Sequence, residues 1–173
     1  MVGIHPRELL ADLEVVYQTL RDAYFEFSLA YNKFRIALKP CFDDGVWSQM
    51  KIRLGLIKSD KEQILEHVFH IRMYFIKYVN DPEINYLMLD DAINESTQFK
   101  AKHLYHIQLI DYLIDTPHYD PSISNNTLLF NSFGKYLRES FALMRKANTL
   151  FRPIHHLLLG FRDARDSGIL PRI

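Results

Sequence analysis

Histidine and glutamate side chains recur in the middle of the chain at spacings that suit metal binding. Two pairs of histidines are each three residues apart, so each pair would share one face of a helix. A glutamate precedes each pair. The residues are Glu66, His67, His70, Glu95, His103 and His106. Imidazole and carboxylate groups that converge between helices form metal centres in helical bundles, so this set is a candidate site for a divalent metal or a small polar ligand.

The position of these residues along the chain predicts which of them face each other. A tight turn near Asp81 would fold two helices back on each other, so that positions adding to about 162 lie side by side. This predicts that His67 lies near Glu95. His103 and His106 fall two to three turns further along, which argues against one compact site.

The pattern of a di-metal carboxylate centre is not present. That pattern requires Glu-x-x-His on two helices. The residue three positions after Glu66 is Phe69, and the residue three positions after Glu95 is Gln98. Hydrogen-bonded or surface histidines are therefore the favoured interpretation, and a metal or polar ligand remains the alternative.

A second group of candidate residues lies in the last fifty positions. Its members are basic or imidazole side chains that could bind a partner: Arg138, Arg145, Arg152, His155 and His156. Pro153 removes one backbone donor inside this segment, which would leave a carbonyl without its usual hydrogen bond. The arginines could contact phosphates along one helix face, so nucleic-acid binding is a further, less favoured alternative.

Other catalytic motifs are absent from the sequence. Gly134-Lys135 lacks the upstream glycine of a phosphate-binding loop, because position 129 is Leu. Cys41 stands next to Asp43 and Asp44, whose negative charge would disfavour a thiolate. We therefore favour a protein without enzymatic activity and without a cofactor. The alternative is a bundle that binds a divalent metal or a small ligand and could act as an enzyme.

The amino-acid composition indicates what class of protein contains these candidate residues. The 173-residue chain is 48% hydrophobic and 24% charged, which is typical of one globular domain spanning 1–173. Net charge is +0, although residues 1–120 hold 13 basic and 18 acidic residues and residues 121–173 hold 8 and 3. The sequence shows no signal peptide pattern and no apolar run of membrane-spanning length, so we expect a cytoplasmic protein.

The first helix is the clearest element in the sequence, with an expected range of about 6–38. Its large apolar residues repeat at alternating spacings of three and four: Leu10, Leu13, Tyr17, Leu20, Tyr24, Phe27, Tyr31, Phe34 and Leu38. Beside this seam runs a stripe of mostly small residues, Val16, Ala23, Ala30 and Ala37. The small stripe predicts a close approach to one neighbouring helix.

The remaining chain divides into further helices. Residues 40–58 predict a short helix flanked by turns, and Ser59 with Glu62 reads as a capping box that starts a helix over 60–80. Asp81-Pro82 would cap a third long helix over 82–115, with Leu87 inward. Residues 116–126 form a loop.

The last helix again carries a seam of spacings of three and four. It contains Phe130, Phe133, Leu137, Ser140, Met144, Ala147, Phe151, Ile154, Leu158 and Phe161. The seam stays in register past Pro153, which predicts a kinked helix that continues.

The expected fold is an all-α antiparallel bundle of four long helices with one short additional helix after the first. The leading functional hypothesis is a non-enzymatic interaction module, an adaptor, regulator or assembly subunit, that binds a protein partner or forms a homo-oligomer. No membrane association is expected.

Overall fold

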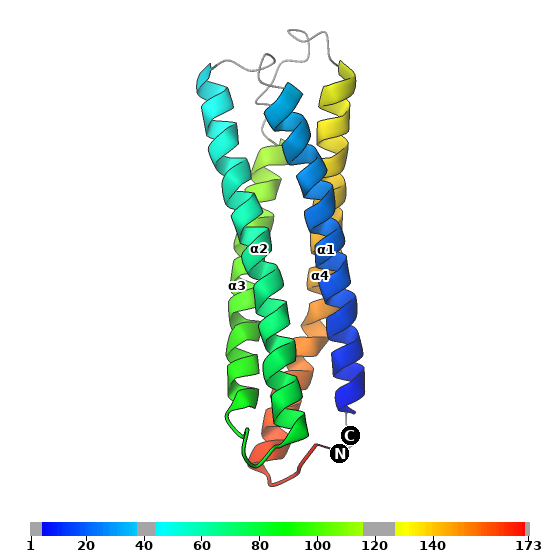
Figure 1. The fold of residues 1–173 in the computed structure, drawn as a ribbon, viewed down its shortest axis with the longest axis vertical. Helices are drawn as coiled ribbons and strands as arrows, with labels where there is room; N and C mark the ends of the chain where they lie inside the picture. Colours follow the sequence, from blue (N-terminus) through cyan, green and yellow to red (C-terminus); the bar gives the residue numbers. More distant parts are fainter. Residues whose placement is uncertain (1–4, 38–43, 116–126, 172–173) are drawn as a thin grey trace.

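The computed structural model describes residues 5–37, 44–115 and 127–171, with side chains left undescribed at 37, 46, 110–115 and 127–132. The described chain forms four long helices and contains no strand (Figure 1). They are α1 (Pro6–Ala37), α2 (Asp44–Asn80), α3 (Met88–Asp115) and α4 (Thr127–Asp166). The predicted all-α antiparallel bundle is therefore confirmed. Cys41 and the predicted loop at 116–126 lie outside the described residues.

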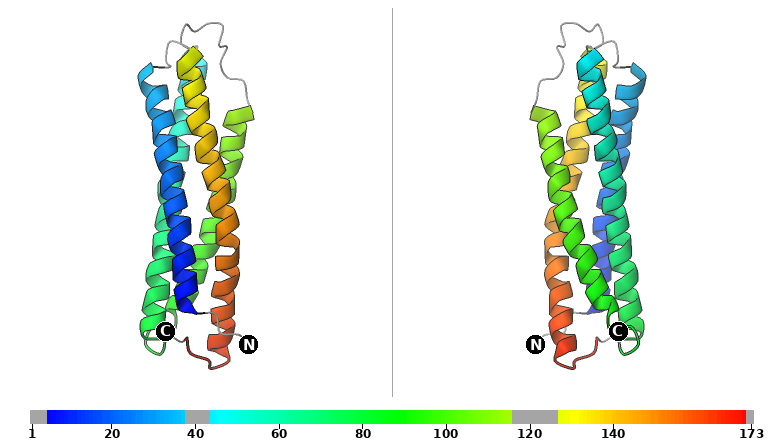
Figure 2. Two further views of the ribbon diagram at one scale, coloured as in Figure 1. Left: turned by 90° about the vertical axis from the view of Figure 1, so that its right-hand side faces the viewer. Right: turned by 90° about the vertical axis from the view of Figure 1, so that its left-hand side faces the viewer.

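The four helices are arranged as two close pairs. Helix α1 packs most closely against α4, and α2 packs most closely against α3. The looser contacts of α1 with α2 and of α3 with α4 join the pairs into a four-cornered bundle, which Figure 2 shows from two sides. The bundle is therefore built from two close helix pairs that meet along looser seams.

The face of α1 that contains its small residues lies deeper in the core than its tyrosines. The fully buried stripe consists of Leu9, Leu13, Val16, Leu20, Ala23, Phe27, Ala30 and Phe34. Small side chains let two helix backbones approach, and the Ser140 hydroxyl on α4 donates to the Ala23 carbonyl at 2.7 Å. Tyr17, Tyr24 and Tyr31 are only half-buried. The Tyr24 hydroxyl donates to a Glu62 carboxylate oxygen at 3.1 Å, because a phenol needs a polar partner at the edge of the core.

A separate short helix after α1 is not observed. Residues 44–80 form one continuous helix that passes through Gly55 and Ser59. A glycine inside a helix costs only about 1 kcal/mol relative to alanine, and buried Leu54 and Ile57 on either side of it outweigh that cost. The expected capping box is therefore interior helix, where the Ser59 hydroxyl accepts from the Gln63 amide at 3.5 Å.

Helix α3 begins six residues later than expected. Asp81 caps a turn rather than the helix, since its carboxylate accepts from the Ile84 backbone N–H at 3.3 Å. Pro82 to Leu87 form turns before the helix starts at Met88. Asn85 stabilises these turns by donating from its side chain to the Lys77 carbonyl at 2.9 Å. Leu87, expected to be inward, is consequently 67% exposed.

Helix α4 continues through Pro153 as predicted, and the described members of its seam are all buried. It ends at a glycine cap. Gly168 has a φ of +80°, and the Ile169 N–H donates back to the Ala164 carbonyl at 2.9 Å. Within the described ranges, no helix combines the length and the hydropathy needed to cross a membrane.

Candidate functional site

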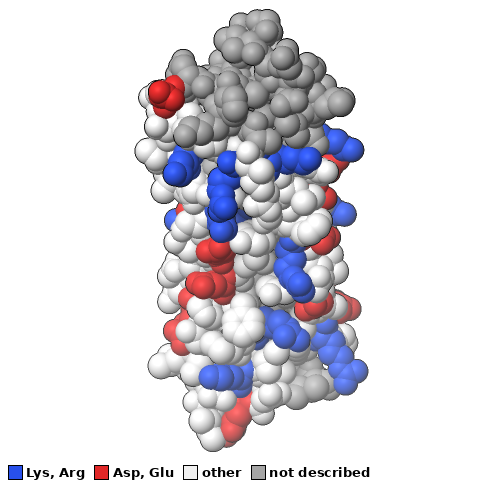
Figure 3. All heavy atoms as spheres, turned by 45° about the horizontal axis from the view of Figure 1, so that its top comes forward, with Lys and Arg blue, Asp and Glu red and all other residues white. Residues whose placement is uncertain are grey.

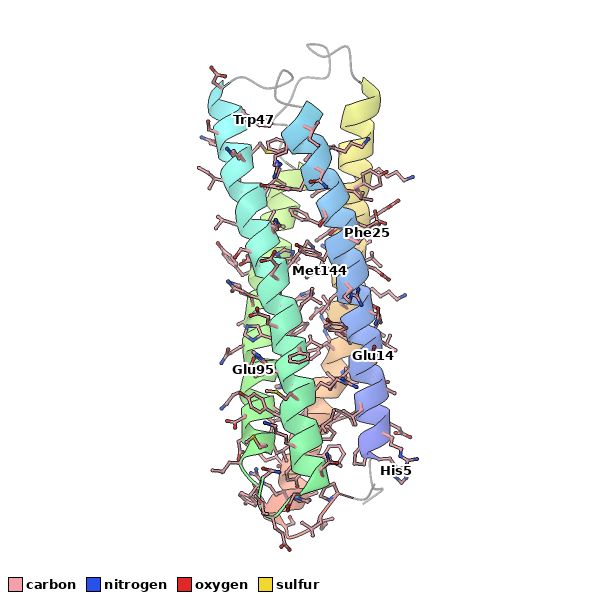
Figure 4. The ribbon with its side chains drawn as sticks, viewed as in Figure 1. His5, Glu14, Phe25, Trp47, Glu95 and Met144 are labelled. Carbon is pink, nitrogen blue, oxygen red and sulfur yellow. The ribbon has the colours of Figure 1, made fainter. Side chains whose placement is uncertain are left out.

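The hydrophobic core of the bundle is interrupted by a layer of polar side chains. One apolar cluster contains Ala23, Ile64, Phe99 and Met144, and the other contains Phe27, Ile57 and Leu137. Between them lie buried polar residues from three helices, which we call the polar layer: Lys61, His103, His106 and Ser140, with Asp60 at its edge. The layer lies near the mid-height of the bundle, at the level of Met144 in Figure 4.

The helical repeat of α2 places Lys61 in the layer. Ile57 lies four residues before it and Ile64 three residues after it, and both are buried. Lys61 therefore occupies a position of the apolar seam, and its side chain has to point inward. Sequence reasoning missed Lys61 and Asp60 because a helix start was placed at Ser59, which broke the seam at this point.

The amine of Lys61 is buried without a partner. The residue is 2% exposed, and its Nζ atom has no hydrogen-bond partner among the described residues. Its nearest aromatic neighbour is Phe27, whose ring centroid lies 5.4 Å from Nζ. Burial disfavours the charged ammonium and lowers the pKa of Lys61 to about 7, so both the amine and the ammonium are populated at neutral pH.

His103 is held in one orientation by α4. Its Nε2 lies 2.8 Å from the Met144 carbonyl, which can only accept, so Nε2 carries the proton and Nδ1 keeps a lone pair. That Nδ1 atom is buried and has no partner among the described residues. Burial lowers the pKa of His103 to about 4; the hydrogen bond to Met144 opposes this effect, and the charge of Lys61 adds to it.

His106 and Asp60 form the outer edge of the layer. His106 is 0% exposed, and neither of its ring nitrogens has a hydrogen-bond partner in the described chain. Its Nδ1 lies 4.0 Å from Asp60 Oδ2, beyond hydrogen-bond distance. Burial lowers the pKa of His106 to about 4, although the neighbouring Asp60 opposes this shift.

The carboxylate of Asp60 is directed towards α3. Its Oδ1 lies 2.9 Å from Lys102 Nζ. Burial alone would raise the pKa of Asp60, but the neighbouring His106 and Lys102 outweigh burial and lower it below its ordinary value. Asp60 is therefore ionised at neutral pH and paired with Lys102, which leaves Lys61 without a carboxylate partner of its own.

The structure divides the six predicted metal ligands between two places. His67 Nδ1 lies 2.6 Å from Glu95 Oε2, as the antiparallel pairing predicts, and His70 Nδ1 lies 3.7 Å from Glu95 Oε1. Glu66 is exposed. The other two histidines belong to the polar layer. Among the described residues, no group of three His, Cys, Asp or Glu side chains is arranged to hold a metal ion.

The predicted partner-binding residues of α4 also separate. Those exposed on the surface are Arg138, Arg145, Arg152 and His156. His155 instead turns towards α3, where its Nδ1 lies 2.6 Å from the Ser96 hydroxyl, and burial lowers its pKa. On the face shown in Figure 3, basic and acidic side chains are interspersed over the described surface.

The polar layer presents a defined set of unused hydrogen-bonding groups. A protonated Lys61 offers three donors, His106 offers one donor and one acceptor, His103 offers one acceptor, and Asp60 Oδ2 is a further acceptor without a hydrogen-bond partner among the described residues. All of them are enclosed by apolar side chains of both clusters, where an unpaired polar group costs about 1–3 kcal/mol. An oxygen-bearing group that entered this layer would satisfy the donors directly.

Comparison with known proteins identifies no relative of this chain. No family model matches the chain, and no similar curated protein or similar solved structure is found.

Proposed function

We propose that this protein binds a small organic ligand between its helix pairs, at the polar layer. The observation that carries the proposal is the amine of Lys61, which is buried without any acceptor among the described residues. Buried charges in proteins are normally paired, and Asp60, the carboxylate next in sequence, is paired with Lys102 instead. A ligand oxygen would provide the hydrogen-bond acceptor that Lys61 lacks in the described chain.

The surroundings of the layer favour a ligand with an apolar body and one oxygen-bearing end. Lys61 can donate to a carboxylate or carbonyl oxygen, whereas Phe27, Phe99 and Met144 offer only apolar surface to the rest of the molecule.

Benzoate and toluene provide a matched pair of probes for this proposal. We expect benzoate, but not toluene, to raise the unfolding midpoint, because only benzoate carries the oxygens that Lys61 lacks. At 100 times its Kd, a ligand adds about 2.7 kcal/mol to the free energy of unfolding. Binding of the anion should also favour protonated Lys61, so calorimetry near pH 7 should detect proton uptake.

The variant Lys61→Met is the control for this experiment. It should keep the fold and lose both the benzoate response and the proton uptake. Equal stabilisation of the wild-type protein and of Lys61→Met, or no stabilisation of either by benzoate, would contradict ligand binding at Lys61. The second result would favour a layer that only fixes the register of the helices.

A second candidate function is the interaction module indicated by the sequence, with a second copy of this chain as the partner. Its support is a group of exposed aliphatic side chains at one end of the bundle, which we call the apolar tip: Ile84, Leu87, Ile169 and Leu170. Hydrogen bonds connect the two segments of the tip, since Arg165 donates to the Tyr86 carbonyl at 2.9 Å. Aliphatic groups held together in this way favour burial against another surface.

Light scattering after size-exclusion chromatography tests the second candidate. We expect a dimer or larger assembly at about 100 µM that dissociates when Ile84 and Leu87 are both replaced by glutamate, because buried charges oppose association. The matched control is Ile36→Glu, which changes an equally exposed residue far from the tip. A wild-type monomer, or an assembly that the tip variant leaves intact, would exclude this tip as the interface.

A further inference from the structure

We infer that Lys61 captures aldehydes covalently and reversibly, forming an imine with a ligand held in the polar layer. This inference rests on the proposed ligand-binding function and specifies its chemistry. It would make the protein a carrier or sensor of apolar aldehydes, or give it the first step of a carbonyl-directed reaction.

The placement of the amine is the first support. Imine formation needs a neutral amine with a free lone pair, and an ammonium held in an ion pair cannot provide one. The Nζ atom of Lys61 has no hydrogen-bond partner in the described chain, and Asp60 on the same turn is engaged by Lys102. The apolar surroundings that lower the pKa of Lys61 to about 7 keep a large fraction of the amine neutral at physiological pH.

The neighbouring imidazole is the second support, because imine formation requires proton transfer. The negative charge of Asp60, 4.0 Å from Nδ1 of His106, favours the tautomer with the proton on that nitrogen. The Nε2 atom of His106 then keeps a lone pair, buried and without a partner among the described residues. His106 can therefore accept a proton at Nε2 and return it within the layer.

The reaction is balanced without any further reagent. The lone pair of Lys61 Nζ attacks the carbonyl carbon, a C–N bond forms, and the carbonyl π electrons move to the oxygen. A proton passes from the nitrogen to that oxygen, with His106 as the relay, which gives a carbinolamine. The hydroxyl takes a second proton through His106 and leaves as water while the nitrogen lone pair forms the C=N bond. The resulting iminium returns its N–H proton to His106, which leaves the neutral imine. One aldehyde and one amine become one imine and one water, and hydrolysis reverses the reaction.

Reductive trapping of the full-length protein tests the inference. Benzaldehyde and cyanoborohydride at pH 7 convert any imine into a stable benzylamine, which peptide mass mapping assigns to a lysine. We expect Lys61 to be labelled at least ~10-fold faster than Lys135, an exposed lysine of α4. The reason is that an amine with a pKa near 7 is neutral about a thousand times more often at pH 7 than one at the ordinary lysine value.

Two variants and one competitor complete the experiment. Lys61→Met should lose the fast labelling phase, and Lys100→Met, which removes an exposed lysine of α3, should keep it. Benzoate should slow the labelling of Lys61 by occupying the same place. Labelling of Lys61 no faster than that of Lys135 would overturn the inference. If benzoate still stabilised the wild-type protein in that case, ligand binding would stand without covalent capture, and if it did not, both proposals would fail.

Discussion

Replacing Lys61 with methionine should raise the free energy of unfolding at pH 7 by about 4 kcal/mol. The folded protein lowers the pKa of Lys61 from 10.5 to about 7, and each pKa unit corresponds to about 1.4 kcal/mol. Methionine has a similar length and no charge, so it removes this cost and keeps the packing. Urea denaturation of the two proteins at pH 7 measures the difference.

The pH dependence of this difference identifies its cause. Below about pH 7 both the folded and the unfolded states hold the proton on Lys61, and the cost of burying the charge is complete. Between about pH 7 and 10.5 only the unfolded state holds it, so the stability of the wild-type protein should rise with pH. The advantage of Lys61→Met should therefore shrink towards pH 10.5. If the free energy of unfolding of Lys61→Met exceeded that of the wild-type protein by the same amount at every pH, the amine of Lys61 would not be buried as a charged group.

Lys61→Arg is the informative counterpart of the methionine variant. A guanidinium cannot lose its proton at any pH reached in these experiments, so the charge would stay in the core. We expect this variant to be less stable than the wild-type protein at pH 9, where the wild-type lysine is largely neutral. Together the two variants separate the effect of charge from the effect of side-chain volume.

Acidification from pH 6.5 to pH 4 should destabilise the bundle through His103 and His106. Burial lowers the pKa of each from 6.5 to about 4, so in this range the unfolded state binds two protons that the folded state does not. Stability is therefore complete above pH 6.5 and falls as the pH decreases, by on the order of 3 kcal/mol for each histidine at pH 4. Denaturation midpoints across this range measure the loss.

Single histidine variants test the source of the acid sensitivity. His106→Leu should reduce by about one the number of protons taken up on unfolding, and so lower the slope of the free energy of unfolding against pH. It should also raise the free energy of unfolding at pH 7, because it removes two buried nitrogens without hydrogen-bond partners. His5→Gln, at an exposed histidine near the start of α1, should leave the slope unchanged (Figure 4). An unchanged slope in His106→Leu would assign the acid sensitivity to other groups.

Helix periodicity explains how much of the fold was predictable. The seams of α1 and α4 are long and regular, so both helices, the inward face of α4 and its passage through Pro153 followed from spacing alone. The inward face of α1 was predicted only in part, because its stripe of small residues is buried more deeply than its tyrosines. The errors lie where local signals compete with packing. Gly55 and Ser59 resemble a break in α2, yet apolar residues on both sides keep the helix continuous, and the turns after Asp81 displace a helix start that Pro82 alone suggested.

The candidate site was predictable only in part, for a related reason. The antiparallel turn placed His67 beside Glu95 correctly, because helix geometry fixes that register. The separation of His103 and His106 from the other histidines also followed from their distance along the helix, whereas their burial without partners depends on which face of α3 they occupy. The burial of Lys61 was not predicted, because a lysine is expected on the surface unless the helical turns before and after it are known to be buried.

The pairing of α1 with α4 also determines the order in which the protein can assemble on the ribosome. Helices α2 and α3 are neighbours in sequence and can pair as soon as both have emerged. The closest partner of α1 is α4, which begins at Thr127, long after α1 ends at Ala37. The apolar face of α1 therefore stays without its closest partner until α4 has emerged.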